Sequence, residues 1–296
     1  MQTAALTAFL AANPAIFGTG IAILALLIGS FLNVVILRLP RMMEHTWRRE
    51  AQQLLQSDVS LGGGSGAEAL SLAHPPSTCP KCGHLIRPWE NVPVISYLFL
   101  RGRCAKCREP ISARYPLVEA TTAVLSVVVA LHFGVSWTCA LALLFTWALV
   151  ALTMIDFDHQ LLPDSITLPL LWLGLLVNSF GVLVPLADAV WGAALGYLSL
   201  WSVYWAFRLL TGKEGMGFGD FKLLAALGAW LGWQALPLVI ILSSLVGAVV
   251  GVALIFALGR DRNVPIPFGP YLAAAGWITL LWGDAISGAY LSAVTP

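Results

Sequence analysis

Two aspartates lie where a membrane-embedded chain tolerates acidic residues least. Asp156 closes the apolar run 138–155, and Asp220 ends the glycine-broken segment 215–220 just before another apolar run. Placing an acid in or beside the bilayer core costs about 3 kcal/mol on insertion scales, so we expect a chain that does this twice to use the acids. Two carboxylates that approach each other can share one proton and activate a water molecule, which is the chemistry of an aspartic protease.

The first acidic segment, residues 156–164, offers three candidate carboxylates. Asp164 follows Pro163 where a new helix is expected, and helix N-capping accounts for it without chemistry. Asp158 lies farther into the turn, where we expect it to be solvated. Asp156 joins an apolar helix directly, which makes it the favoured catalytic residue.

The second acidic segment places Gly217 and Gly219 on either side of Phe218, directly before Asp220. Glycine lets another backbone approach closely, which a protease requires to hold an extended substrate beside its acid. A flexible turn in which Asp220 caps a helix is the alternative. Helix polarity favours the anion at Asp220, at a helix start, and the neutral acid at Asp156, at a helix end. On that basis Asp220 is predicted to be the base.

Four cysteines form two C-x-x-C pairs, Cys79 with Cys82 and Cys104 with Cys107, separated by 21 residues. Two such knuckles supply the four thiolates of a closed tetrahedral zinc site, and no coordination position remains open for catalysis. The sequence therefore predicts a structural zinc. Two disulfides or a redox pair are the alternatives, and the expected cytoplasmic location of this loop argues against disulfides.

The composition is that of a membrane protein. Hydrophobic residues make up 58% of the 296 residues and charged residues 10%, whereas soluble domains carry about 25% charged residues. The net charge of +1 and the absence of a basic run give no reason to expect nucleic acid as a partner. We predict an all-α polytopic fold with about eight transmembrane helices, at residues 15–37, 117–134, 137–155, 165–184, 186–209, 221–233, 235–258 and 268–292.

The distribution of basic residues sets the expected orientation. Eleven of the sixteen Lys and Arg residues lie between Arg38 and Arg114. With eight spans and the N-terminus outside, all sixteen fall on the cytoplasmic side, as the positive-inside rule requires. If the short segment 221–233 does not cross, Arg260 and Arg262 fall outside. Eight spans place both acids near the cytoplasmic face. Residues 1–15 contain no Lys or Arg, so we expect no cleavable signal peptide.

Three regions follow from this layout. We predict a first transmembrane helix in residues 1–38, a cytoplasmic loop domain with the zinc site in 39–115, and a transmembrane aspartic protease core in 116–296. Residues 44–58 have the spacing of an amphipathic helix, either interfacial or solvated. Residues 61–66 are a glycine-rich linker that lacks the Lys-Ser/Thr ending of a phosphate-binding loop.

Taken together, these motifs resemble one family over nearly the whole chain. The chain is similar to the bacterial type IV prepilin peptidases, a group of membrane aspartic proteases with a G-x-G-D signature. The segments that carry the resemblance are Gly29–Ile36 with Arg38 and Pro40, the two C-x-x-C pairs, Asn91–Pro93 with Ser96 and Tyr97, Ser112–Glu119, Asp156–Asp164 and Gly217–Lys222.

The resemblance implies that Asp156 and Asp220 are the catalytic aspartates. It implies prepilin and pseudopilin substrates, which carry a short basic leader before a hydrophobic helix and are cleaved after a glycine at the cytoplasmic border of the membrane. It also implies a multi-pass protein of the bacterial inner membrane, embedded in the lipid bilayer, with a periplasmic N-terminus and an active site that faces the cytoplasm.

The resemblance implies a second activity as well. Family members of this length with the cysteine loop also N-methylate the new N-terminal residue, with S-adenosylmethionine as methyl donor. The sequence contains no G-x-G-x-x-G motif, so this activity is implied by the resemblance alone. We expect the first helix and the cysteine loop to carry this methyltransferase activity. Asn33, Arg114 and Glu119 are candidate residues, and interhelical hydrogen bonding is the alternative role for them.

Two other classes of function deserve comparison. A transporter or channel would also use intramembrane acids, but it predicts acids near the midplane and paired half-helices. A zinc-bearing membrane scaffold leaves the acids without a role. The predicted position of both acids at one face favours the protease.

Overall fold

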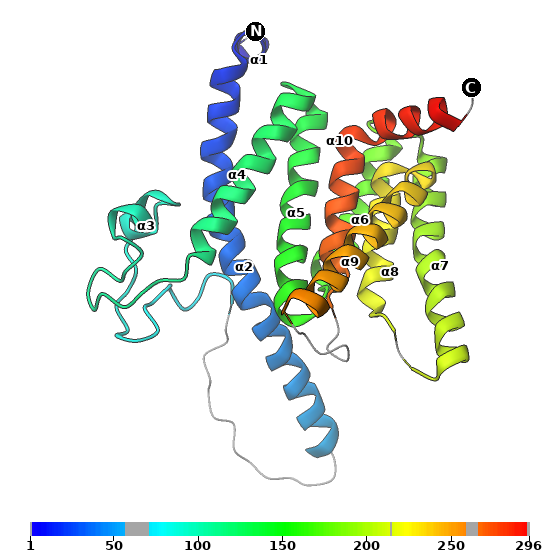
Figure 1. Ribbon diagram of the computed structural model, residues 1–296. Helices are drawn as coiled ribbons and strands as arrows, with labels where there is room; N and C mark the ends of the chain where they lie inside the picture. The colour runs from blue at the N-terminus through cyan, green and yellow to red at the C-terminus, as the bar shows by residue number, and fades with distance from the viewer. Residues whose placement is uncertain (1, 57–70, 214, 259–265, 295–296) are drawn as a thin grey trace. The chain divides into compact units, whose positions relative to one another are not determined.

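The computed structural model describes the whole chain except residues 1, 57–70, 214, 259–265 and 295–296 (Figure 1). Within the described residues the chain forms α-helices, two short 3-10 helices and two isolated β-bridges, with no β-strand. It divides into two compact units, residues 1–135 and residues 136–296. The expected all-α class is therefore confirmed for the described part of the chain.

The first unit is built on two long helices and a loop region. Its elements are α1 (Gln2–Ala12), α2 (Pro14–Gln56), the 3-10 helix η1 (Pro88–Asn91), α3 (Ile95–Phe99) and α4 (Arg114–Phe133). The helix expected from residue 44 is present over residues 44–56, where it forms the end of α2, which continues through Pro40. The stretch from residue 41 to residue 56 is rich in Arg, Gln, Glu, Met and Leu, and these strong helix formers extend the helix. Residues 57–58 and the predicted linker 61–66 lie outside the described residues.

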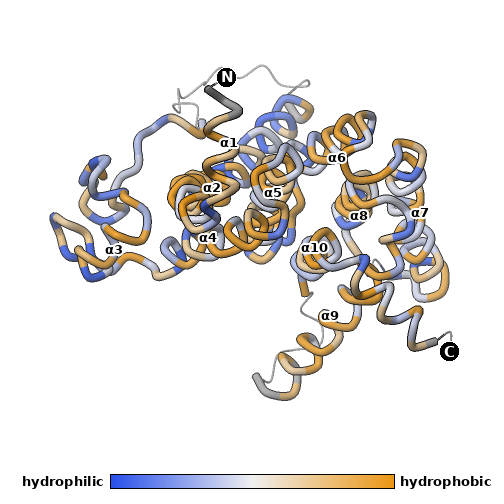
Figure 2. Tube along the Cα trace, turned by 90° about the horizontal axis from the view of Figure 1, so that it is seen from above, coloured by the Kyte–Doolittle hydropathy of each residue, from blue (hydrophilic) through white to orange (hydrophobic). Residues whose placement is uncertain are grey.

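The second unit is a bundle of apolar helices. Its elements are α5 (Trp137–His159), α6 (Asp164–Ser179), α7 (Leu186–Thr211), α8 (Phe218–Leu231), the 3-10 helix η2 (Trp233–Ala235), α9 (Leu236–Leu258) and α10 (Gly269–Val294). Each α-helix corresponds to one of the predicted spans, with ends shifted by a few residues. Figure 2 shows hydrophobic residues along most of these helices.

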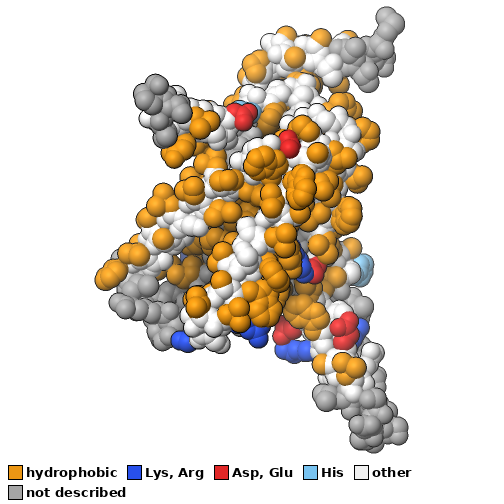
Figure 3. All heavy atoms as spheres, turned by 90° about the vertical axis from the view of Figure 1, so that its right-hand side faces the viewer, with side chains coloured by type: hydrophobic (Ala, Val, Ile, Leu, Met, Phe, Trp, Pro, Cys, Tyr) orange, Lys and Arg blue, Asp and Glu red, His pale blue; other side chains and the backbone are white. Residues whose placement is uncertain are grey.

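Five described helical segments are long and apolar enough to cross a membrane. They are Pro14–Leu54, Arg114–Phe133, Trp137–His159, Leu186–Thr211 and Trp233–Leu254. The surface is correspondingly apolar: hydrophobic side chains cover most of the face seen in Figure 3. Exposed apolar area on this scale is what lipid tails cover. The chain is therefore a multi-pass membrane protein.

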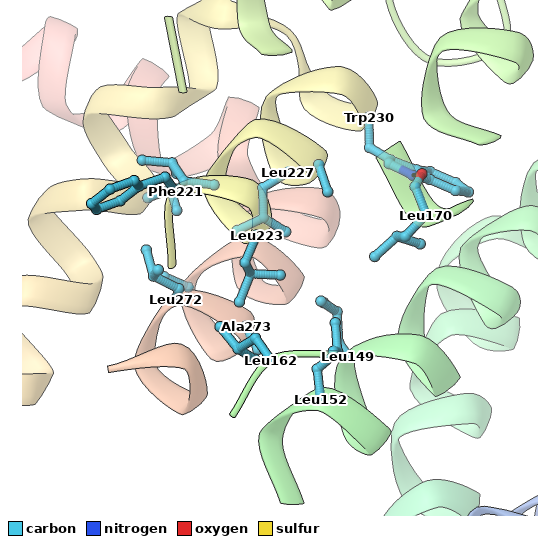
Figure 4. Close-up of a cluster of buried hydrophobic side chains, with 14 of the residues drawn as sticks. Leu149, Leu152, Leu162, Leu170, Phe221, Leu223, Leu227, Trp230, Leu272 and Ala273 are labelled. Atoms are coloured by element: carbon cyan, nitrogen blue, oxygen red, sulfur yellow. Dashed lines mark hydrogen bonds between the residues drawn. The ribbon is translucent and has the colours of Figure 1, made fainter. Parts of the chain in front are cut away.

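The core of the second unit is organised around α8. The side chains of Phe221, Leu223, Leu227 and Trp230 have almost no exposed surface. Figure 4 shows these side chains surrounded by residues from three other helices and one connecting segment, namely Leu149 and Leu152 of α5, Leu170 of α6, Leu272 and Ala273 of α10, and Leu162. At 14 residues, α8 is about 21 Å long, and most of its residues are buried in the protein.

Glycines bring α7 and α8 into direct backbone contact. A Cβ atom on Gly192 would overlap the carbonyl oxygen of Gly228, and a Cβ on Gly228 would overlap that of Gly192. One turn on, a Cβ on Gly196 would lie 2.6 Å from the carbonyl oxygen of Leu224. Small residues at such positions are the usual means by which membrane helices pack closely.

The far end of α8 is fixed by a buried asparagine of α6. The Asn178 side-chain amide donates to the carbonyl oxygens of Ala229 and Trp230, at 2.9 and 3.1 Å. Its oxygen accepts from the N–H groups of Leu183 and Val184, both at 3.1 Å. The amide thus satisfies carbonyl groups that the end of a helix leaves without partners.

Candidate active site and metal centre

Asp156 lies in the last turn of α5, on its buried side. The helix ends at His159, and Gln160 adopts a left-handed conformation (φ 52°, ψ 42°) that caps it, with its N–H donating to the Asp156 carbonyl oxygen at 2.9 Å. The Asp156 residue is 5% exposed. The sequence places this acid at a helix end beside the apolar core, and the fold agrees.

Asp220 lies in the first turn of α8. The helix begins at Phe218 with Gly217 as its N-cap, and the Asp220 N–H donates to the Gly217 carbonyl oxygen at 3.3 Å. Asp220 is 8% exposed. A carboxylate in this position is favoured by the positive end of the helix dipole.

Close contacts through Leu162 join the two acid-bearing segments. A Cβ atom on Gly219, next to Asp220, would lie 2.8 Å from the Leu162 Cβ. A Cβ on Gly269 would lie 3.2 Å from the Leu162 Cδ2 and 2.6 Å from the Asp156 Oδ2. Residues 64 positions apart in the sequence therefore belong to one site within the second unit.

Sequence reasoning missed one contributor to this site. The backbone N–H of Gly269, the first residue of α10, donates to the Asp156 Oδ2 at 2.9 Å in a buried hydrogen bond. The available signal was Gly269-Pro270 immediately before an apolar run, since proline near the first helical position marks a helix start.

This hydrogen bond alters the expected roles of the acids. The N-terminus of α10 favours the anion at Asp156, just as the N-terminus of α8 favours the anion at Asp220. Helix polarity at these two contacts therefore acts on both acids in the same direction, and which of the two is the neutral acid stays a prediction.

The two competing acids lie elsewhere. Asp164 is the first residue of α6, and both of its carboxylate oxygens accept from the Lys222 Nζ at 2.7 Å. Its ion pair joins the start of α6 to α8. Asp164 therefore has a structural role, but it is not the expected N-cap, which is Pro163. Asp158 is exposed in the last turn of α5.

The four cysteines gather in the first unit. Their sulfur atoms lie within 4.8 Å of one another, with Cys79 Sγ 3.8 Å from Cys107 Sγ and Cys82 Sγ 4.0 Å from Cys104 Sγ. A tetrahedral metal with bonds of about 2.3 Å to sulfur separates its ligands by about 3.8 Å. All five cysteines of the chain are free thiols. The cluster therefore has the donors and the spacing of a tetrahedral metal site.

The two C-x-x-C knuckles have the same backbone construction. In each, the first cysteine exchanges backbone hydrogen bonds with the residues four and five positions later: Cys79 with Gly83 and His84, and Cys104 with Arg108 and Glu109. The residue after each pair has positive φ, 67° at Gly83 and 58° at Arg108. Each knuckle is closed by one β-bridge, Thr78 with Leu85 and Arg103 with Pro110. This local repeat is not evident from the sequence.

The charges around the cluster favour a bound cation. The N–H groups of Cys82 and Lys81 lower the pKa of the Cys79 thiol to about 7. Although the Glu109 N–H favours its thiolate, burial and the other thiols raise the pKa of Cys107 to about 12. A metal that binds thiolates would favour the ionised form of Cys107 against these effects.

The histidine nearest to the cysteines in the sequence, His84, contacts a carboxylate of the surrounding loop. His84 Nε2 lies 3.0 Å from the Glu90 carboxylate, which also accepts from the Arg87 N–H at 3.0 Å. The Arg87 N–H and His84 together hold the pKa of Glu90 below its usual range. His84 is therefore engaged away from the four sulfur atoms.

The other polar candidates of the first unit lie where α2 meets α4. Asn33 Nδ2 donates to the Tyr115 carbonyl oxygen at 3.1 Å. The Glu119 Oε2 accepts from the Val94 N–H at 2.7 Å. Both side chains are buried, and Arg114 begins α4. The expected interhelical hydrogen bond is thus present for Asn33, while Glu119 joins α4 to the loop before α3.

Comparison with known proteins decides the family. Residues 23–133 match the Bacterial Peptidase A24 N-terminal domain, and residues 143–252 match the Type IV leader peptidase family. A protein of Stutzerimonas stutzeri named prepilin leader peptidase/N-methyltransferase is 58% identical over 96% of both chains. The chain belongs to the type IV leader peptidase family.

Other members of the type IV leader peptidase family agree. Proteins with the same name are 57% identical in Pseudomonas aeruginosa, over 96% of both chains, and 50% identical in Xanthomonas campestris pv. campestris, over 96% of this chain and 98% of the relative. No solved structure matches the chain. The resemblance drawn from the motifs is therefore confirmed, and the two matched regions follow the two compact units.

Proposed function

We propose that the chain is a membrane-border aspartic endopeptidase that removes the basic leader of type IV prepilins and pseudopilins after a glycine. It then N-methylates the new N-terminal residue with S-adenosylmethionine. The relatives that are 50–58% identical carry both activities in their name. The observation that best supports the peptidase half is the joining of two buried aspartates through Leu162 and Gly269 in one unit.

In the proposed reaction Asp156 and Asp220 hold one water molecule between them. One carboxylate takes a proton from the water, whose oxygen attacks the scissile carbonyl carbon, and the protonated partner donates to the carbonyl oxygen. Two close carboxylates share a proton because both do not ionise readily. The Gly269 N–H fixes the Asp156 carboxylate while protons move, and Gly217, which has no neighbouring atom closer than 4.0 Å to a Cβ position, leaves space for an extended substrate backbone.

The proposed membrane arrangement has eight spans with a periplasmic N-terminus in the bacterial inner membrane. Residues 1–38 supply the first transmembrane helix, residues 39–115 a cytoplasmic domain, and residues 116–296 the protease core. This layout puts all sixteen Lys and Arg residues on the cytoplasmic side. It also puts the acids at the membrane face where a basic leader is available for cleavage.

The proposed metal is a structural zinc bound by the thiolates of Cys79, Cys82, Cys104 and Cys107. Four sulfur ligands leave no open position, so zinc would fix the two knuckles relative to each other without entering the chemistry. The Lys81–Glu109 ion pair, at 2.6 Å, joins the same two knuckles from outside.

The test is a cleavage assay with a prepilin in detergent, with leader removal followed by mass. Asp156→Asn and Asp220→Asn each remove an ionisable carboxyl and are expected to stop cleavage. Asp158→Asn, an exposed acid on the same turn as Asp156, is the matched control and is expected to cleave normally. Near-normal cleavage by either of the first two variants would refute the assignment of that residue.

A further inference from the structure

A buried carboxylate in the first unit has no part in the peptidase chemistry. Glu119 is 7% exposed on α4. Its Oε2 accepts from the Val94 N–H at 2.7 Å, and the Ser30 side chain lies beside it. Among the described residues, no Lys, Arg or His side chain forms an ion pair with it. An ionised carboxylate offers about four acceptor positions, so this one retains capacity, and burial without a cation favours a cationic ligand.

The backbone around Glu119 is shaped to hold that carboxylate. A Cβ atom on Gly29 of α2 would lie 2.7 Å from the Glu119 Cα, so only glycine admits α4 this closely. Val94 has φ 58° and ψ −46°, and the Ile95 N–H donates to the Pro93 carbonyl oxygen at 2.5 Å. This is a γ-turn with positive φ, which is rare and strained, particularly for a β-branched residue.

Strain of this kind persists only where the surroundings impose it, and it concentrates at functional sites. Here it aims the Val94 N–H at the Glu119 carboxylate and ties the metal-bearing loop region to α4. The same helix start holds Asn33 through the Tyr115 carbonyl oxygen. A polar, preorganised site is therefore present in an otherwise apolar contact between two helices.

The proposed function has two activities, leader cleavage and N-methylation, and the chain has two compact units that could each carry one of them. The acid pair lies in residues 136–296, the unit that contains the leader peptidase match at 143–252. The N-terminal match at 23–133 covers Glu119 and the cysteines, and none of the peptidase residues. The methyl-transfer chemistry is left to the first unit.

We propose that Glu119 is the proton acceptor in methyl transfer to the primary amine of a peptide N-terminus. This inference rests on the methyltransferase half of the proposed function. The ammonium group of the peptide binds the carboxylate and passes one proton to it. The freed nitrogen lone pair forms a bond to the methyl carbon of the sulfonium donor. The carbon–sulfur bond breaks with its electrons on sulfur, which leaves a secondary ammonium ion and a neutral thioether. The proton then leaves Glu119 to water.

The experiment uses the full-length protein in detergent with prepilin and a methyl donor labelled in its methyl group. Leader removal and label incorporation are measured in the same reaction. Glu119→Gln keeps the length of the side chain and an acceptor for the Val94 N–H, but it cannot take up a proton. We expect methylation to fall at least 100-fold, the low end of what a general base contributes, with leader removal unchanged.

A second variant separates a chemical role from a structural one. Glu119→Asp retains an ionisable carboxyl but is one carbon shorter, so it fits the Val94 contact worse than Gln. A proton acceptor predicts more methylation in Glu119→Asp than in Glu119→Gln, whereas a purely structural contact predicts the reverse order. Equal methylation in the two variants, or the reverse order, would overturn the proposal. Thr122→Val, which removes a buried hydroxyl one turn along α4, is the control and keeps both activities.

A third reaction separates this proposal from the peptidase assignment. Mature pilin without its leader is given to a chain that carries Asp156→Asn. Methylation is expected to continue there and to disappear when Glu119→Gln is added. Persistent methylation in the double variant refutes the role of Glu119, while cleavage by Asp156→Asn alone refutes only the peptidase assignment.

Discussion

The Gly269–Asp156 contact yields the sharpest prediction for the peptidase site. In Gly269→Ala the new Cβ would lie 2.6 Å from the Asp156 Oδ2 and 3.1 Å from its Cγ, whereas ordinary van der Waals contact begins near 3.4 Å. The Asp156 carboxylate must therefore move by about 0.8 Å, because the backbone fixes the position of the new Cβ atom. A misplacement of about 1 Å at a reacting group costs about 100-fold in rate, or roughly 2.7 kcal/mol in the activation barrier.

The assay measures the initial rate of leader removal at saturating prepilin. The thermal unfolding midpoint of each variant is measured as well. Gly276→Ala is the matched control, because a Cβ there would lie 2.5 Å from the end of the Leu227 side chain, on the same helix and away from the acids. Both variants are expected to lose about 1–3 kcal/mol of stability through overpacking, but only Gly269→Ala loses cleavage. A rate for Gly269→Ala within about threefold of the parent, equivalent to less than 1 kcal/mol, would show that this N–H does not hold Asp156 for the reaction.

Three further perturbations test the supports of the two sites. Lys222→Met breaks the ion pair with Asp164, and because that aspartate is half-exposed the loss in stability should stay below about 1 kcal/mol; a larger fall in the unfolding midpoint would contradict this. Gly192→Leu forces a side chain into the backbone of Gly228 and is expected to separate α7 from α8, with loss of folded protein in size-exclusion chromatography; a well-folded variant would disprove the close contact. Cys79→Ser removes one thiolate of the proposed metal site, so limited proteolysis should cut residues 71–113 faster and methylation should fall more than cleavage; equal loss of both activities would contradict a local role for the proposed metal.

Much of the helical layout could be predicted because it follows from hydrophobicity. The apolar runs fix where helices form, and Asp156 and Asp220 interrupt those runs at their borders, so their positions at helix ends were predictable. The cysteine spacing likewise predicts a cluster of four thiols, since each C-x-x-C turn brings two sulfur atoms together whatever lies between the pairs.

The parts that could not be predicted depend on contacts between distant segments. The hydrogen bond from Gly269 to Asp156 joins residues 113 positions apart, and no local pattern in the sequence predicts a contact between such distant residues. The same holds for Lys222 with Asp164, where capping was the expected role of the aspartate. The first transmembrane helix was expected to end near residue 38, where the apolar run ends, whereas α2 continues through Pro40 to Gln56 because the polar residues that follow also favour a helix.

The glycine contact between α7 and α8 has a mechanical consequence. At Gly192 and Gly228 the two backbones are in direct contact, so at this point no side chain separates the helices that could change rotamer and let one slide along the other. We therefore expect any movement that carries Asp220 away from Asp156 to take α7 along, so that α7 and α8 move as one rigid unit. If the two proposed catalytic acids separate to admit a substrate, we expect α7 and α8 to move together against α5 and α10. A crosslink from α7 to α5 is then expected to block cleavage even though it touches neither acid.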